Sequence, residues 1–255
     1  MNINNTSSNI QNISQQLASG NRINSAANDA AGLAIAERMS AQERGTNQGT
    51  RNTADMQSLV RTAEGALSSI NSGLQRLNEL ALQASNGILT DSDRNNMQRE
   101  VNQILDHIQS VSENTQFNTR NLLDGTAQNL NTASSPNGTG PSVSIPGMSL
   151  EALGLEGFSV NNGEIDIGAI HAAMNIVNGA RSNLGAMENR MNHIMTSNDI
   201  SALNLASSRS RIADTDMALA SMELSRERVL EQYQLAAQRR EMERMEDQSQ
   251  RLFTL

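Results

Sequence analysis

The residues that break helices are concentrated in the middle of this chain. All three prolines, Pro136, Pro141 and Pro146, lie within eleven residues, and no glycine follows Gly185. Proline lacks the N–H that a helix needs, and glycine loses the most conformational freedom on folding. Long helices can therefore form on both sides of a short central segment. The sequence predicts a mainly α-helical fold with two helical arms around a small centre.

In the first arm, residues 53–86 carry an apolar residue at alternating steps of four and three. Heptad spacing of this kind places side chains on one stripe of a helix. The stripe contains Met56, Val60, Ala63, Leu67, Ile70, Leu74, Leu77, Ala81 and Ala84. Gly87 then ends the helix, and Thr90 with Asp93 is typical of a capping box that starts another. This second helix repeats the pattern, so we expect it to pack antiparallel on the first.

The second arm runs from Gly168 to the C-terminus with an almost continuous helical pattern. Its stripe contains Ile170, Met174, Val177, Leu184, Met187, Met191 and Ile194. We predict a break between Thr196 and Asp199, after which the pattern resumes through Leu235. A helix this long cannot bury its own stripe. It must pack on the first arm, on other subunits, or on both.

The central segment, Asn121 to Ile167, lacks helical periodicity. Phe158–Val160 and Glu164–Ile167 alternate apolar and polar residues around Asn161–Gly163, which predicts a β-hairpin. Thr126–Ser144 is interpreted as a flexible linker, although its hydroxyl groups are also candidates for O-glycosylation. The complete prediction is an elongated antiparallel helical bundle or coiled coil with a small β-hairpin.

Composition excludes several kinds of chemistry. All nineteen basic residues are arginine, and the chain has no lysine and no cysteine. A lysine Schiff base, a P-loop lysine, a thiolate nucleophile and a disulfide are therefore impossible. Aromatic residues make up only 2% of the chain, and the net charge is −8. We expect no enzyme, no cofactor and no nucleic-acid partner.

The sequence predicts neither a membrane-spanning helix nor a secretory signal peptide. No apolar run of about 18 residues predicts a membrane span. The segment Met1–Ser19 has neither the basic nor the apolar part of a secretory signal. We therefore expect no membrane partner, and any export would need another route.

Two groups of residues are of types that can bind metal ions. Asp91, Asp93 and Glu100 lack the spacing of an EF-hand loop, and a helix cap explains the aspartates better. The three histidines are far apart in the sequence and form no His-Glu-x-x-His motif. They are His107, His171 and His193. No metal site is expected.

Several motifs resemble those of bacterial flagellins. Leu17–Asn24 and Ala27–Ile35 resemble the N-terminal signature of that family. Segments similar to its N-terminal spoke helices are Ala63–Leu67, Leu74–Ala81, Gln83–Asn86, Thr115–Asn118 and Leu122–Gly125. Segments similar to its C-terminal spoke are Leu184–Arg190 and Ser208–Asp216. The motifs occur in the order that the family has.

The resemblance implies a structural subunit that polymerises into the extracellular flagellar filament for motility after export by the flagellar type III system. The implied partners are other copies of the chain, the export apparatus, an export chaperone and the filament cap. A further implied partner is the innate-immune Toll-like receptor 5.

Family architecture and helical pattern together suggest five regions. They are an inner-core helix and connector at 1–40, N-terminal spoke helices at 41–120, a short variable and β-hairpin region at 121–167, a C-terminal spoke helix at 168–210, and a C-terminal inner-core helix at 211–255. Both inner-core regions depart from the family, since the first looks shortened and the last is unusually charged.

Two sets of residues are candidates for contacts. Arg76, Leu80 and Glu100 match positions that the receptor reads in the family, and they also suit contacts between protofilaments, a role that can coexist with receptor binding. Leu80 is expected to be exposed there. The predicted assembly seam consists of Leu67, Ile70, Leu74, Leu77, Ile104, Ile108, Leu184 and Met191.

Two other functions remain open. One is the junction protein between hook and filament, which shares the N-terminal signature. The other is a secreted flagellin-like ligand or adhesin that does not polymerise, suggested by the altered ends.

Overall fold

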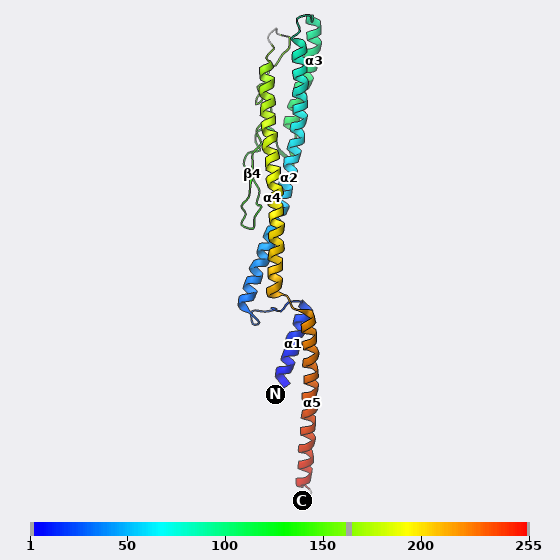
Figure 1. The fold of residues 1–255 in the computed structure, drawn as a ribbon. Helices are drawn as coiled ribbons and strands as arrows, with labels where there is room; N and C mark the ends of the chain where they lie inside the picture. The colour runs from blue at the N-terminus through cyan, green and yellow to red at the C-terminus, as the bar shows by residue number, and fades with distance from the viewer. Residues whose placement is uncertain (1–2, 162–164, 254–255) are drawn as a thin grey trace. The chain divides into compact units, whose positions relative to one another are not determined.

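The computed structural model describes residues 3–161 and 165–253. Its helices are α1 (Ile3–Ser19), α2 (Ala30–Ala84), α3 (Asp91–Asn114), α4 (Ile167–Ala213) and α5 (Met217–Phe253) (Figure 1). The strands are β1 (Gln116–Phe117), β2 (Arg120–Asn121), β3 (Leu130–Asn131) and β4 (Ser142–Val143). The predicted mainly α-helical fold is confirmed. None of the helices so described has an apolar stretch that would let it cross a membrane.

The chain divides into two compact units. The central unit comprises residues 44–202, and the terminal unit comprises residues 1–43 and 203–255. Helices α2 and α4 each contribute to both units. Each unit has its own packing and is described separately.

In the central unit, the heptad stripe of α2 forms the core. Leu67, Ile70, Leu74 and Leu77 are fully buried. They pack in one cluster with side chains of α3, α4 and the segment between these helices, including Val101, Ile108, Leu122, Leu123, Ile145, Met148, Leu155, Val177, Leu184 and Met191. The predicted stripes are thus apolar core, and α2, α3 and α4 run beside one another (Figure 1).

The start of α3 is the predicted capping box. The Asp93 backbone N–H donates to Thr90 Oγ1 at 3.3 Å, and the Thr90 N–H donates to Asp93 Oδ2 at 3.1 Å. The Thr90 hydroxyl also donates to Asp93 Oδ2 at 2.7 Å. These bonds, the hydroxyl's first, hold the pKa of Asp93 below its ordinary value.

The predicted flexible linker at 126–144 is wrong. Leu130 pairs with Val143 across the β3–β4 hairpin, and both side chains are buried. The segment then lies flat on two helices, because Asn52 Nδ2 of α2 donates to the Ala133 carbonyl and Asn198 Nδ2 of α4 donates to the Ser134 carbonyl, both at 2.9 Å. Backbone groups that a linker would leave to water are bonded to the protein.

A glycine makes this close approach possible. A Cβ atom at Gly49 of α2 would lie 2.3 Å from the Ser134 carbonyl oxygen, which is well inside van der Waals contact. Any side chain at this position would push the β3–β4 segment off α2.

The hairpin predicted around residues 158–167 is also wrong over the residues that the structure describes. Its turn, 162–164, lies outside those residues. Phe158–Val160 forms no strand, because the Val160 N–H donates to Gln98 Oε1 of α3 at 2.7 Å instead of to a neighbouring strand. On the other side, Ile167 already begins α4, and the Ala169 N–H donates to Asp166 Oδ1.

The break in the C-terminal arm lies later than predicted. Helix α4 continues through Thr196–Asp199 and ends at Ala213. Asp216 then caps α5, since its Oδ1 accepts hydrogen bonds from the N–H groups of Ala218 at 3.0 Å and Leu219 at 3.1 Å. The acidic residues around Thr215 were the signal for a new helix start.

In the terminal unit, α1 packs antiparallel on α5. The Thr6 hydroxyl donates to Gln234 Oε1 at 3.2 Å, and the Ser7 hydroxyl donates to Glu231 Oε1 at 3.0 Å. At the other end of α1, Asn21 bridges to Asp214. Sequence number therefore rises along α1 as it falls along α5.

Replacing Gly49 by alanine should detach the β3–β4 segment and destabilise the central unit by about 2–4 kcal/mol, because the new methyl overlaps a backbone carbonyl. Gly65→Ala on the same helix is the control. A Cβ there meets no atom within 4 Å, so it should stabilise α2 by about 0.5–1 kcal/mol. Urea unfolding followed by circular dichroism measures both effects. Equal stabilities of the two variants would contradict this packing.

The capping box should make α3 sensitive to acid. Because folding lowers the pKa of Asp93, its stabilising contribution is present above pH about 4 and is lost as the pH falls through the lowered value. Thr90→Ala should raise the pKa of Asp93 toward its ordinary value in an NMR titration. Asp124, whose pKa is lowered mainly by the Thr126 hydroxyl, should titrate as before. An unchanged Asp93 titration would contradict the assignment.

Candidate functional site

The predicted contact residues of the N-terminal spoke form an ion-pair cluster. Arg76 Nε donates to Glu100 Oε1 of α3 at 2.7 Å, and Arg76 Nη1 donates to Glu79 Oε2 at 2.9 Å. These bonds, that from Glu100 first, raise the pKa of Arg76 above its ordinary value. The Arg76 side chain remains 49% exposed, so the cluster presents a fixed guanidinium on the surface.

Leu80 does not join this surface. It is only 2% exposed and packs in the central core. The expectation of an exposed leucine beside Arg76 is wrong, because the heptad stripe at Leu77 and Ala81 turns Leu80 inward as well. The exposed leucine of this part of α2 is Leu82, at 56%.

The predicted assembly seam is buried within the single chain. Leu67, Ile70, Leu74, Leu77, Ile108 and Met191 are fully buried, Leu184 is 3% exposed, and Ile104 is half-buried. Side chains this inaccessible cannot touch another copy unless the unit opens. The seven buried side chains belong to the core of the central unit, and Ile104 packs against it.

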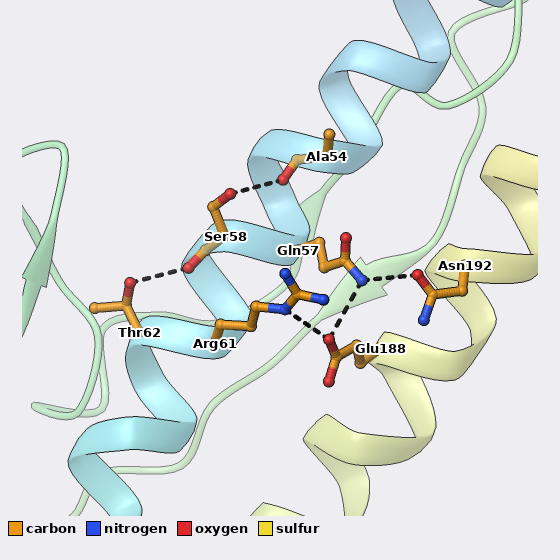
Figure 2. Close-up of polar contacts among 7 residues, drawn as sticks. All are labelled: Ala54, Gln57, Ser58, Arg61, Thr62, Glu188 and Asn192. Atoms are coloured by element: carbon orange, nitrogen blue, oxygen red, sulfur yellow. Dashed lines mark hydrogen bonds and ion pairs between the residues drawn. The ribbon is translucent and has the colours of Figure 1, made fainter.

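A polar layer interrupts the apolar contact between α2 and α4. Gln57 is 7% exposed, and its Nε2 donates to Asn192 Oδ1 at 2.8 Å and to Glu188 Oε1 at 3.3 Å. Arg61 Nε donates to the same Glu188 oxygen at 2.7 Å. Figure 2 shows the four side chains converging between the two helices. A buried amide that is satisfied in only one alignment fixes the register of two helices.

Residues of the N-terminal signature join the connection between α1 and α2 to the connection between α4 and α5. The Arg22 N–H donates to the Ala213 carbonyl, and Arg22 Nη2 donates to the Ile212 carbonyl, both at 2.7 Å. Both acceptors lie in the last turn of α4, where a cation also suits the helix dipole. In return, the Thr215 N–H donates to the Gly20 carbonyl at 2.9 Å.

Farther along the signature, Asp29 starts α2. Asp29 Oδ1 accepts the Gly32 N–H at 2.8 Å, which caps the helix. A second tie joins α2 and α4, since Arg209 Nη1 lies 3.1 Å from Glu43 Oε2. The Leu17–Ile35 segment thus acts as a structural connector.

Most of the exposed large apolar side chains of the terminal unit lie on α5, with Ile35 of α2 and Leu203 of α4 as the exceptions. Leu219, Met222, Val229, Leu230 and Tyr233 are all at least 40% exposed. At 100° per residue they gather on one side of the helix, where Met222, Val229 and Tyr233 lie opposite the side that carries Glu231 and Gln234 toward α1. We call these five residues the outer stripe of α5. The sequence pattern does not reveal this stripe, because periodicity gives apolar positions without showing which of them another helix covers.

A second uncovered group lies farther along α5. Met242 and Met245 are 68% and 70% exposed. Between and around them stand charged residues of both signs, namely Arg239, Arg240, Glu241, Glu243, Arg244, Glu246 and Asp247.

The described residues hold no group of three or more His, Asp or Glu side chains that could bind a metal ion. The pair Asp91 and Asp93 belongs to the start of α3 instead, where Asp93 closes the capping box. His107 lies on an exposed surface of α3, with its Nε2 3.1 Å from Ser69 Oγ.

Comparison with known families agrees with this architecture. The profile of the bacterial flagellin N-terminal helical region matches residues 1–128, and that of the bacterial flagellin C-terminal helical region matches residues 167–253. The chain belongs to the bacterial flagellin family. Members of this family are structural proteins.

Individual relatives align over most of the chain. It is 40% identical over 225 residues to a flagellin of Halalkalibacterium halodurans, covering 86% of this chain and 82% of the relative. It is 39% identical over 239 residues to the flagellar filament core protein flaB2 of Brachyspira hyodysenteriae, covering 86% and 84%. The crystal structure of Bacillus cereus flagellin matches with a TM-score of 0.51 at 28% identity, covering 58% of this chain and 88% of that one.

Replacing Leu67 by aspartate should unfold the central unit of the free subunit, because a carboxylate would be buried without a partner. The expected loss is at least about 4 kcal/mol. Leu82→Asp, on the exposed side of the same helix, should change stability by less than about 0.5 kcal/mol. Urea unfolding of monomers compares them. A Leu67→Asp monomer as stable as the native chain would show that Leu67 is an intersubunit contact and not core.

Proposed function

We propose that this protein is the structural subunit of a bacterial flagellar filament. The observation that carries the proposal is the outer stripe of α5, an apolar surface that the subunit's own helices leave open. Contiguous exposed apolar surface on a soluble subunit marks an interaction site. Relatives of similar length include flagellins and a flagellar filament core protein, and this supports a second copy of the chain as the occupant.

The charged part of α5 supports association between copies. Residues 239–247 contain three arginines and four acidic residues. Because both signs alternate along one helix, neighbouring copies can pair opposite charges. Burying any one of them unpaired would cost several kcal/mol, so pairing or contact with water is required.

The rigid core of the central unit supports a mechanical role. The polar layer at Gln57 fixes the register of α2 and α4, and Arg22 fixes the connections of the terminal unit. In our proposal the chain is exported by the flagellar type III apparatus with the help of a chaperone and assembles extracellularly beneath a filament cap. The filament then serves motility.

The Arg76 cluster is a second proposed contact. Its guanidinium is held by Glu100 and Glu79 and stays half-exposed. Arginine held in place in this way suits protein interfaces, because little side-chain freedom is lost on binding. We assign it to contacts between protofilaments, and to Toll-like receptor 5 when subunits are free.

Charge placed on the outer stripe should prevent assembly without unfolding the subunit. Val229→Glu alters a side chain that is 64% exposed in the single chain, so its thermal unfolding should match that of the native protein. Concentrated native chain, seeded with sheared filaments of the same protein, should sediment as fibres, whereas Val229→Glu should stay in the supernatant.

The control is Ile88→Glu, which changes an 85% exposed residue between α2 and α3 and should still sediment. Fibres formed by Val229→Glu at the native concentration would refute the outer stripe as the assembly surface. A native chain that stays soluble with seeds would favour the non-polymerising ligand or adhesin instead.

A further inference from the structure

Sulfur is distributed unevenly between the two units. The chain has thirteen methionines and no cysteine, so thioethers are its only sulfur groups. In the central unit every methionine is buried or half-buried, and Met148 and Met191 are fully inaccessible. All four methionines of α5 are more than half exposed: Met217, Met222, Met242 and Met245.

Two of these methionines continue the row of α5 that faces α1. Glu231 and Gln234 receive the hydrogen bonds from Ser7 and Thr6 of α1. Further steps of four, four and three residues along the same helical face lead through Gln238 to Met242 and Met245. Because the helices are antiparallel and Thr6 lies at Gln234, the described part of α1, which begins at Ile3, ends its cover before Met242.

Met222 belongs to the outer stripe. It precedes Val229 by seven residues and Tyr233 by eleven, so the three share one face, opposite α1. Methionines therefore occur on both uncovered surfaces of α5, and in the free subunit their sulfur atoms are open to small solutes.

A peroxide can oxidise such a thioether directly. The sulfur lone pair attacks one peroxide oxygen, an S–O bond forms, the O–O bond breaks, and water leaves after proton transfer. Methionine loses two electrons to become the sulfoxide, and hydrogen peroxide gains them. The product is polar where the thioether was apolar, which disrupts methionine-rich contacts.

We propose that Met222, Met242 and Met245 form an oxidation site at which hydrogen peroxide blocks assembly of the free subunit. This inference rests on the proposed function, because the sulfoxides act by making the assembly surfaces of α5 polar. In the fibre the same side chains are covered by neighbouring copies, so assembly protects them. Sensitivity to peroxide is thus confined to the time before a subunit is incorporated.

The first measurement is the order of oxidation. Full-length monomer treated with hydrogen peroxide and analysed by peptide mass spectrometry should carry sulfoxide at Met222, Met242 and Met245 before Met148 and Met191. The same treatment of preformed fibres should slow oxidation at the three α5 sites at least tenfold. Equal rates in monomer and fibre would overturn the proposed protection.

The second measurement is assembly. Oxidised monomer should need about a tenfold higher concentration to form seeded fibres, as expected when polar groups enter an apolar contact. A chain with Met222→Leu, Met242→Leu and Met245→Leu should assemble equally well with and without peroxide. The control pair Met148→Leu and Met191→Leu should remain sensitive. A triple variant as sensitive as the native chain would overturn the assignment.

Reduction gives an independent test if the triple variant itself assembles poorly. Oxidised native monomer treated with methionine sulfoxide reductases should regain the original assembly threshold. No recovery, despite complete reduction by mass, would refute the role of these sulfoxides. Failure of unoxidised native chain to form fibres would instead count against the proposed function.

Discussion

The structure depends on the covering of one apolar stripe. Along α2, fully buried side chains from Val60 to Leu77 meet α3, α4 and the segment between them in a single cluster. Burying a leucine or isoleucine contributes roughly 1.5–3 kcal/mol, so this cluster must supply most of the free energy that orders the central unit. Because this stripe is covered within one chain, the subunit can fold before it meets another copy. Other surfaces of the subunit are then used for association.

Local features of the helices could be predicted from the sequence because they depend on neighbouring residues. Heptad spacing identified the stripe of α2, and the Thr90–Asp93 box marked the start of α3. The hairpin expected near Phe158 failed because Gln98, distant in sequence, takes the Val160 N–H. The supposed linker is ordered for a similar reason, since Asn52 and Asn198 bind its carbonyl groups. Hydrogen bonds between distant residues leave no periodic trace in a sequence.

In the candidate site, too, some features could be predicted from the sequence and others could not. Leu67 and Val229 both lie within predicted helical patterns, yet Leu67 is fully buried and Val229 is 64% exposed. Periodicity reveals which side chains share a helix face. Which element, if any, covers that face depends on the tertiary fold. The expected assembly seam was therefore found in the core, and α1 proves too short in its described part to cover all of α5. Within the family signature, Arg22 binds the last carbonyls of α4, a contact that motif spacing does not predict.

The pairing of α1 with α5 has a consequence for synthesis. Thr6 and Gln234 are 228 residues apart, so α1 leaves the ribosome long before α5, the helix on which it packs. At 5–20 residues per second, the wait is roughly 10–50 s. An isolated helix of 17 residues is only marginally stable in water, so α1 spends that interval largely uncoiled. Helices α1 and α5 can therefore pair only after the residues between them have been synthesised.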